Sequence, residues 1–305
     1  MATFHSDPML KARLMEIADG LAASITDKSG EREKLNWSSR QWCPAPYVCQ
    51  KGPACDHHYY ADEIGVSVSL AYAERAIFLN LSTAQAKGWW KRFFKAIPVG
   101  VELDEASVIS RLSVEILNKL LAYTQDAEQY GAVKTIIDLF EMRCVDQELW
   151  DKAAARATAA HHKSPYDNRR MEAEDARRHA GCMACYAASY FARSVKDPRY
   201  IAEAISWSGW PMRYFTYAQH MASSSDPRKQ VPVSDDGMVN VGTALFASGQ
   251  WMRISEKGDE LGEVERHSHY FWVSQKLIEA LDEANPNWSF FRGGVTRGLR
   301  RLIAS

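Results

Sequence analysis

The sequence predicts an all-α protein, a multi-helix, bundle-like globular fold with a loop rich in cysteine and histidine near its N-terminus. Apolar residues recur every three or four positions through most of the chain, which is the period of a helix with one buried face. Strict alternation, the strand pattern, occurs only in "GVSVSLAY", which continues directly into helix-favouring sequence. With 305 residues, the chain buries enough surface to fold without a metal or a disulfide.

Start signals define the helices in chain order. Asp7–Pro8 supplies an N-cap and a first-turn proline, and the same pair returns at Asp197–Pro198. Ser82 and Gln85 have the spacing of a capping box, and Asp104 precedes a long periodic segment. The expected helices cover residues 7–25, 82–98, 104–123, 133–144, 147–162, 169–195, 212–222, 241–255 and 264–284.

Two polar stretches that contain proline predict internal boundaries. One surrounds Pro165 in "HKSPYDN", and the other runs from Ser223 to Gly237. We expect an N-terminal helical region over 1–163, which includes the cysteine-rich loop, and a C-terminal helical region over 164–305. The two regions can also form one continuous domain.

Charge and targeting signals limit the function. Lys and Arg number 37 against 38 Asp and Glu, so no global field attracts nucleic acid or an anionic membrane. The N-terminus has no basic segment leading into an apolar run, and no stretch of about 18 apolar residues occurs. We therefore expect a cytoplasmic protein. Its six cysteines then indicate metal binding, catalysis or burial before a disulfide framework.

The stretch "WCPAPYVCQKGPACDHHYY" gathers half of the cysteines in a segment that prolines and a glycine keep from being helical. Cys43, Cys49 and Cys55 are followed closely by His57 and His58. Thiolates and imidazoles are the ligands that Zn²⁺ prefers in proteins. Five residues separate successive cysteines, a wider spacing than the two to four of a typical zinc site.

A second cysteine pair completes the predicted metal site. Cys182 and Cys185 lie three apart on one face of an expected helix, with His179 one turn earlier. We expect zinc, or alternatively an iron–sulfur cluster, bound by ligands from this set: Cys43, Cys49, Cys55, His57, Cys182 and Cys185. Two other interpretations of the helix pair stay open, packed thiols in a helix interface and a redox dithiol. Cys144, alone in its segment, is expected in the core.

The segment "KGWWKRFFKAI" predicts an amphipathic helix with an aromatic arc and a basic arc. The aromatic arc contains Trp89, Trp90, Phe93, Phe94 and Ile97, and the basic arc contains Lys91, Arg92 and Lys95. Such a helix usually buries its aromatics and solvates its charges. The basic arc can alternatively form a surface for anions, nucleic acid or a membrane.

Histidines occur in two further helical patterns. Glu263 and His267, like Glu265 and His269, are four residues apart and form either carboxylate–imidazole pairs for a metal or substrate, or solvated pairs on an exposed face. The adjacent pair His161–His162 stands at a helix end, where the C-terminal dipole favours it.

Common catalytic signatures are missing from the sequence. It contains no phosphate-binding glycine loop, nucleophile elbow or HExxH helix. We expect a metal-stabilised helical protein, most simply a zinc protein, that acts by binding a macromolecular partner, and a protein partner before nucleic acid. The alternatives are an enzyme with an iron–sulfur cluster or an open metal site, and a nucleic-acid-binding protein that uses the basic arc.

Overall fold

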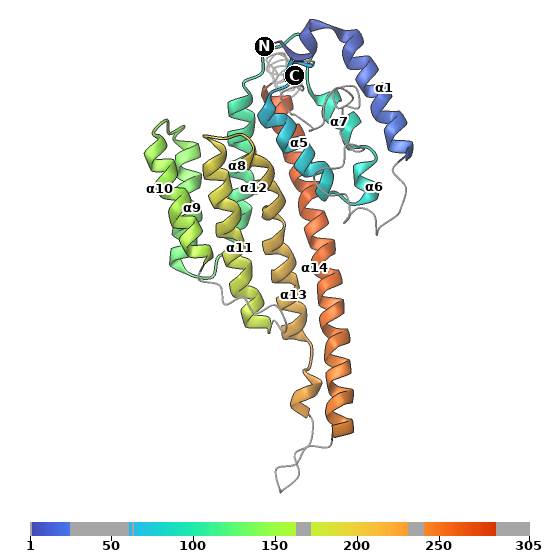
Figure 1. The fold of residues 1–305 in the computed structure, drawn as a ribbon, viewed down its shortest axis with the longest axis vertical. Helices are drawn as coiled ribbons and strands as arrows, with labels where there is room; N and C mark the ends of the chain where they lie inside the picture. Colours follow the sequence, from blue (N-terminus) through green and yellow to red (C-terminus); the bar gives the residue numbers. More distant parts are fainter. Residues whose placement is uncertain (1, 25–60, 63, 163–171, 231–240, 285–305) are drawn as a thin grey trace, which may run out of the picture.

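The computed structural model describes residues 2–24, 61–62, 64–162, 172–230 and 241–284 (Figure 1). In these ranges every regular element is a helix, and the helices pack on one another, so the predicted all-α fold is confirmed. The elements are η1 (Thr3–Ser6), α1 (Pro8–Ser24), α5 (Val68–Asn80), α6 (Thr83–Ala86), α7 (Trp89–Ala96), α8 (Glu105–Leu121), α9 (Ala127–Glu141), α10 (Gln147–His161), α11 (Ala173–Ser194), α12 (Tyr200–Ser208), α13 (Trp210–Ser223), η3 (Pro227–Gln230) and α14 (Val241–Ala284).

The predicted helix starts are formed by the expected side chains. The Asp7 carboxylate accepts the Met9 N–H at 2.8 Å, and Asp104 accepts the Ser107 N–H at 3.1 Å. Ser82 and Gln85 form a complete capping box. The helix that begins there is only one turn long, however, and α7 begins separately at Trp89 after Gly88. The single helix expected over 82–98 is therefore two helices.

The alternating segment "GVSVSLAY" is helical from Val68 onward. Ser67 caps α5 by accepting the Leu70 N–H at 3.2 Å, while its own N–H donates to the Glu105 carboxylate at 3.0 Å. These bonds satisfy backbone groups at the helix start. They favour a helix in this segment over the strand that its short alternating pattern would predict. In the same way Asp126 caps α9, which begins at Ala127, six residues before the predicted start.

The two helices expected over 241–255 and 264–284 are one continuous helix, α14. The predicted break fell on a stretch that contains Gly258 and Gly262, which serve close packing instead. A Cβ on Gly258 would lie 2.9 Å from the Tyr217 ring, and one on Gly262 would lie 2.7 Å from the Arg213 carbonyl oxygen. The glycines thus allow α13 to lie against α14.

The helices α9 to α13 lie side by side along one flank of α14, and α1 and α5 to α7 lie together beside its C-terminal part, with α1 packed on α7 (Figure 1). The N-terminal part of α14 extends past the ends of α8 to α12. Only the end of α13 and η3 lie beside it among the described elements. One hydrophobic core contains residues from both sides of the predicted boundary at 163/164.

The aromatic arc of α7 lies in the core, as the sequence predicts. Trp89, Phe93, Phe94 and Ile97 have no exposed surface, and Trp90 is 3% exposed. None of the helices in the described ranges combines the length and the apolar composition needed to cross a membrane.

Candidate functional site

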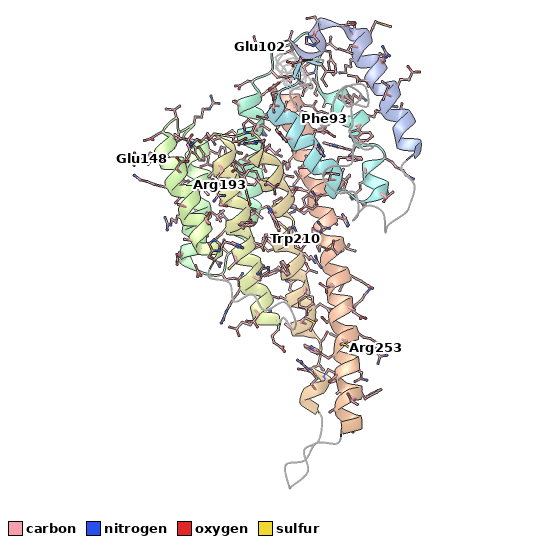
Figure 2. The ribbon with its side chains drawn as sticks, viewed as in Figure 1. Phe93, Glu102, Glu148, Arg193, Trp210 and Arg253 are labelled. Carbon is pink, nitrogen blue, oxygen red and sulfur yellow. The ribbon has the colours of Figure 1, made fainter. Side chains whose placement is uncertain are left out.

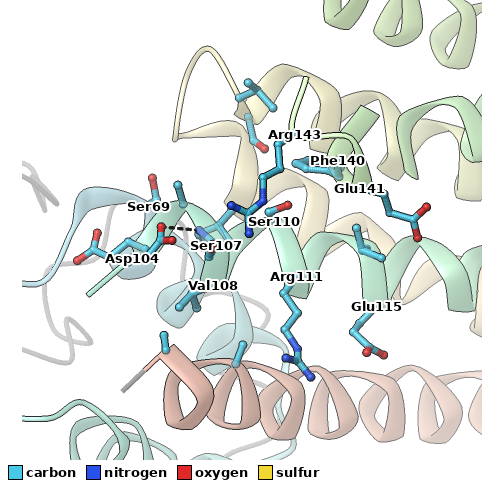
Figure 3. Close-up of a pocket in the computed structure, with 18 of the residues that line it drawn as sticks. Ser69, Asp104, Ser107, Val108, Ser110, Arg111, Glu115, Phe140, Glu141 and Arg143 are labelled. Carbon is cyan, nitrogen blue, oxygen red and sulfur yellow. Dashed lines mark hydrogen bonds between the residues drawn. The ribbon is translucent and has the colours of Figure 1, made fainter. Parts of the chain in front are cut away.

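A pocket of about 850 Å³ lies along α8, and residues of six helices line it (Figure 3). The first half of α8 forms one wall, and the turn between α9 and α10 forms the wall opposite. The N-terminal residues of α5, the C-terminal end of α11 and the last turn of α14 complete the lining. Residues far apart in the sequence therefore converge on this cavity.

Apolar side chains form one part of the lining. Val108 and Trp150 are 1% and 2% exposed, and the Phe140 and Trp150 rings meet edge to face with centroids 4.7 Å apart. The Trp150 indole N–H donates to the Cys144 carbonyl at 3.0 Å, which fixes the ring against the turn. Cys144, expected in the core, is half-buried and lines the pocket.

Arg143 enters the pocket from a left-handed backbone conformation. Its φ of 51° ends α9, with the Arg143 N–H donating to the Phe140 carbonyl and the Cys144 N–H donating to that of Leu139, each at 3.0 Å. Figure 3 shows its side chain extended toward Ser107 on α8. This backbone conformation, which non-glycine residues rarely adopt, places a cation beside the start of α8.

Carboxylates outnumber cations in the lining. The acidic residues are Asp104, Glu105, Glu115, Glu141 and Glu283, and the basic residues are Arg111 and Arg143. Arg111 pairs with Glu283 through both guanidinium nitrogens, one of them at 3.0 Å. Hydrogen bonds from Ser107 lower the pKa of Asp104, with Arg143 adding a smaller attraction. The Arg111 and Arg143 charges are thus directed to the Asp104 and Glu283 carboxylates.

The remaining carboxylates leave one end of the pocket acidic. Glu141 has Lys134 at 3.9 Å, and Glu115 lies on the wall beside it (Figure 3). Glu105 is different, because burial raises the pKa of its carboxyl and the Ser67 N–H donates to it. The Glu115–Glu141 end therefore favours a positively charged group.

The predicted metal ligands fall in two classes. Cys43, Cys49, Cys55 and His57 lie outside the described residues, so their part of the predicted site stays a prediction. Within the described ranges no three His, Cys, Asp or Glu side chains converge in a way that could hold a metal ion.

Cys182 and Cys185 are described, and both are buried between α9, α10 and α11. The Cys182 thiol lies 3.8 Å from the Ala160 carbonyl and accepts from the Gln129 side chain at 3.5 Å. The Cys185 thiol lies 3.8 Å from the Gln129 carbonyl, and burial raises its pKa, with Cys182 adding to the effect. These surroundings favour the neutral thiols of a packed helix interface.

The predicted basic arc of α7 is partly engaged within the protein. Lys91 forms an ion pair with Asp19 on α1 at 2.7 Å. Arg92 lies over the rings of Trp89 and Phe271, 5.8 Å and 5.4 Å from their centroids. Lys95 is exposed. Two of the three cations thus have internal partners.

The Glu–His pairs expected on α14 are not formed. Glu263 instead binds Arg213 and Arg266, and His267 Nδ1 lies 2.9 Å from the Asn80 carbonyl. His269, expected on an exposed face, is 1% exposed. Helical periodicity placed it four residues from a glutamate, but the helix turns that face toward α8 and α12.

His269 forms a buried contact with Ser208. His269 Nε2 lies 2.8 Å from Ser208 Oγ, and the hydroxyl donates to the Ile205 carbonyl at 2.7 Å. His269 Nδ1 has no hydrogen-bond partner in the described part of the chain, and burial lowers the pKa of the ring well below its usual value, with Lys119 contributing. Because both side chains are buried, we interpret the pair as structural rather than nucleophilic.

His161, placed by the sequence at a helix end for its dipole, has closer partners. Its ring stacks on Tyr186 with centroids 4.3 Å apart, and its Nδ1 lies 3.2 Å from the Cys182 carbonyl. Burial lowers its pKa, which favours the neutral ring.

A buried carboxyl group between α5 and α7 gave no signal in the sequence. Glu74 is fully buried, and Trp89 Nε1 donates to its Oε1 at 2.9 Å. Among the described residues its Oε2 makes no hydrogen bond within normal distance. Burial raises the pKa of Glu74 to about 8, which keeps the carboxyl largely protonated at neutral pH.

Comparison of the chain with known proteins gives no match to a family model, to a curated protein or to a solved structure.

Proposed function

We propose that the chain acts by binding a protein partner and that the pocket along α8 receives a basic segment of that partner. The observation that carries the proposal is the composition of the pocket. Its volume of about 850 Å³ suits a few side chains of a bound segment, and its lining carries five carboxylates against two guanidinium groups.

The lining suits a peptide segment in which basic and apolar side chains alternate. A lysine or arginine side chain would reach the Glu115–Glu141 end, and a neighbouring apolar side chain would lie against Val108 and Trp150. The phosphates of a nucleic acid would instead meet carboxylates of the same charge. A basic, partly apolar peptide therefore fits the pocket better than a nucleic acid does.

Fluorescence anisotropy with two labelled peptides tests the proposal. One peptide alternates lysine and leucine, and the other alternates glutamate and leucine. We expect the basic peptide alone to bind, more weakly as salt increases. Replacing both Glu115 and Glu141 by Gln should weaken binding about tenfold, because charge-assisted hydrogen bonds contribute about 1.5 kcal/mol or more.

The matched control replaces Glu256 and Glu260 on α14 by Gln, which removes the same charge away from the pocket. Equal binding of both peptides, or equal losses in the two double variants, would contradict the proposed site.

We further propose that the cysteine-rich loop binds zinc through Cys43, Cys49, Cys55 and His57, a closed set of four ligands that stabilises the fold. The gathering of three cysteines and a histidine in one short segment supports the proposal, although their spacing is wider than in a typical zinc site. The buried, carbonyl-bonded thiols of Cys182 and Cys185 favour a site without the helix pair. The alternative is an iron–sulfur cluster.

Elemental analysis of anaerobically purified protein separates these cases. Zinc in a colourless protein supports the proposal, whereas iron with sulfide in a brown protein supports a cluster. Cys49→Ser should release the metal and lower the melting temperature. Cys185→Ser should keep the full metal content; equal loss in both variants would return the helix cysteine to the ligand set.

A further inference from the structure

The last turn of α14 forms part of the pocket along α8. Ala280, Glu283 and Ala284 line the cavity, and Ala284 is the last residue of the helix. The Glu283 carboxylate binds Arg111 on α8, and Glu115 lies four residues, about one turn, further along α8. The chain therefore leaves α14 at the pocket itself, next to the turn of α8 that carries Glu115.

The residues that follow Ala284 have the composition that the pocket favours. Residues 285–305, which lie outside the described part of the chain, have the sequence "NPNWSFFRGGVTRGLRRLIAS". This segment contains no acidic residue and combines four arginines with large apolar side chains, which are Arg292, Arg297, Arg300 and Arg301 with Trp288, Phe290, Phe291, Leu299, Leu302 and Ile303. It is basic and apolar at once, as the lining requires.

The other stretches outside the described residues lack this combination. Residues 25–60 carry five Lys and Arg against four Asp and Glu, and residues 231–240 are acidic. Residues 163–171 follow the end of α10 that is opposite to Trp150, the residue of α10 that lines the pocket. Residues 285–305 are therefore the segment of this chain whose charge and starting point both suit the pocket.

The acidic end of the pocket can still bind cations. Lys134, which lies 3.9 Å from Glu141, bonds to Asp138 at 2.6 Å. Lys276 is attracted by Glu115, but its ammonium bonds to another carboxylate on α14 at 2.8 Å. Both lysines are thus held mainly elsewhere. An arginine guanidinium, whose planar fork can donate two parallel hydrogen bonds to one carboxylate, suits the two glutamates.

The length of the segment permits the contact. The eight residues from Ala284 to Arg292 can span up to about 26 Å, at about 3.3 Å per residue. The part of α8 that lines the pocket, from Asp104 to Glu115, is about 16 Å long at about 1.5 Å per residue. The arginines can therefore reach the acidic end, and the covalent connection gives the segment an effective concentration on the order of 1 mM there.

We propose that residues 285–305 bind in the pocket of their own chain and compete with the basic segment of the partner. This regulation rests on the function proposed above, because it uses the same site. The arginines bind at the Glu115–Glu141 end, and an aromatic side chain of the segment lies against Val108 and Trp150. A partner has to displace the segment, so its apparent affinity is lower than its affinity for the open pocket.

Fluorescence anisotropy with the lysine–leucine peptide tests the competition in the full chain. The neutralised variant carries four substitutions, Arg292→Gln, Arg297→Gln, Arg300→Gln and Arg301→Gln. We expect it to bind the peptide about tenfold more tightly than the wild type does. This is the effect of a tethered competitor with a dissociation constant of about 0.1 mM at an effective concentration of about 1 mM.

The matched control removes the same charge from exposed residues that do not line the pocket. Its substitutions are Arg177→Gln, Arg178→Gln, Arg253→Gln and Lys257→Gln. Figure 2 shows Arg253 on the part of α14 that extends past α8 to α12. The control should bind the peptide as the wild type does, because only the overall charge has changed.

The outcomes separate this proposal from the function on which it rests. Equal binding by the wild type and the neutralised variant, or an equal gain in the control, overturns the competition and leaves the pocket as a peptide site. Absence of binding by every form, the neutralised variant included, overturns the partner site and the competition with it.

A zero-length cross-link tests the position of the segment. A full chain with Arg292→Lys, Arg297→Lys, Arg300→Lys and Arg301→Lys keeps the charge, and carbodiimide should join its new amines to Glu115 or Glu141. Peptide mass spectrometry detects these amide links, and adding Glu115→Gln with Glu141→Gln should remove them. In a mixture of isotopically labelled and unlabelled chains, the links should join peptides of like label. Links that avoid both glutamates, or that join unlike labels, overturn binding of the segment to its own chain.

Discussion

Helix α7 and the N-terminal part of α14 use similar residues in opposite environments. Both place bulky apolar side chains beside basic ones. In α7 Phe93 and Phe94 have no exposed surface, whereas Phe246 on α14 is 64% exposed. The difference comes from the neighbours. Helices α1 and α14 contact α7, and Trp90 of α7 stacks on Phe78 of α5, whereas the bare face of α14, which carries Leu245, Phe246 and Met252, has no packed neighbour among the described elements.

An amphipathic pattern predicts which side of a helix is apolar, but not whether another element packs against that side. The free energy of burying an apolar side chain is gained only where another element removes it from water. Substitutions at equivalent residues of the two helices should therefore differ in size and even in sign.

The largest difference is expected between two phenylalanines. Phe94→Ala in α7 should lower the free energy of unfolding by about 3–5 kcal/mol, because it leaves a cavity in the core. Phe246→Ala should change the stability of the monomer by less than about 0.5 kcal/mol. Urea unfolding of both variants at low protein concentration measures this, and equal losses would show that Phe246 is covered.

A second test uses the carboxyl group that lies behind α7. Glu74 has a folded-state pKa of about 8, above its ordinary value of 4.5, so the native state holds a proton that unfolding releases. Its contribution to stability is full below the unfolded pKa and is lost as pH rises through about 8, by an amount on the order of a few kcal/mol.

Glu74→Gln should remove this dependence and make the protein more stable than the wild type at alkaline pH. The measurement is the difference in urea midpoint between the two proteins across that range. A constant difference would show that the buried carboxyl does not titrate there. The control is the same substitution at a glutamate that is paired with cations, Glu263→Gln on α14. Glu263 forms ion pairs with Arg213 and Arg266, so its replacement should not remove the loss of stability at alkaline pH.

Two glycines of α14 should respond with opposite signs. Gly262→Ala places a Cβ 2.7 Å from the Arg213 carbonyl and should destabilise by about 1–3 kcal/mol through overpacking. Gly249→Ala meets open space and should stabilise the monomer by up to about 1 kcal/mol through helix propensity. Thermal melts of the two variants at low concentration check the signs, and destabilisation by Gly249→Ala would reveal a neighbour on the bare face.

The smallest effect is expected on the solvent side of α7. Replacing Lys91 and Lys95 by Gln should change stability by less than about 1 kcal/mol, because the Lys91–Asp19 pair is about half exposed and such pairs contribute little. A loss comparable with that of Phe94→Ala would mean that the basic arc, rather than the aromatic arc, fixes α7.

Local signals in the sequence predicted much of the fold. The Asp7, Ser82 and Asp104 caps act through neighbouring backbone groups, so sequence alone reveals them. The continuity of α14 could not be predicted, because Gly258 and Gly262, the glycines at the predicted break, are explained by the approach of α13. The Asp197–Pro198 pair signalled the start of α12, but the extent of this helix was not predicted, because its nine residues give little periodicity and packing on α11 and α5 stabilises it.

The candidate site is harder to predict from the sequence than the helices are. The pocket joins α8 to the α9–α10 turn and to the end of α14, and no local pattern indicates that Glu115 and Glu141 share a cavity. The spacing of Cys182 and Cys185 predicted metal ligands, yet spacing on a helix does not distinguish ligands from packed thiols. The burial of His269 shows the same limit, since its i, i+4 relation to a glutamate is unrelated to the contacts it makes.

The unbroken length of α14 has a mechanical consequence. Its 44 residues span about 66 Å, with Glu283 at the pocket and Leu245 near the opposite end. A stiff rod of that length works as a lever whose fulcrum is the packed C-terminal half. About 33 Å of helix lies beyond that half, so a tilt of about 5° there moves the far end by about 3 Å, and a rearrangement too small to disturb the core is amplified where the helix leaves the bundle.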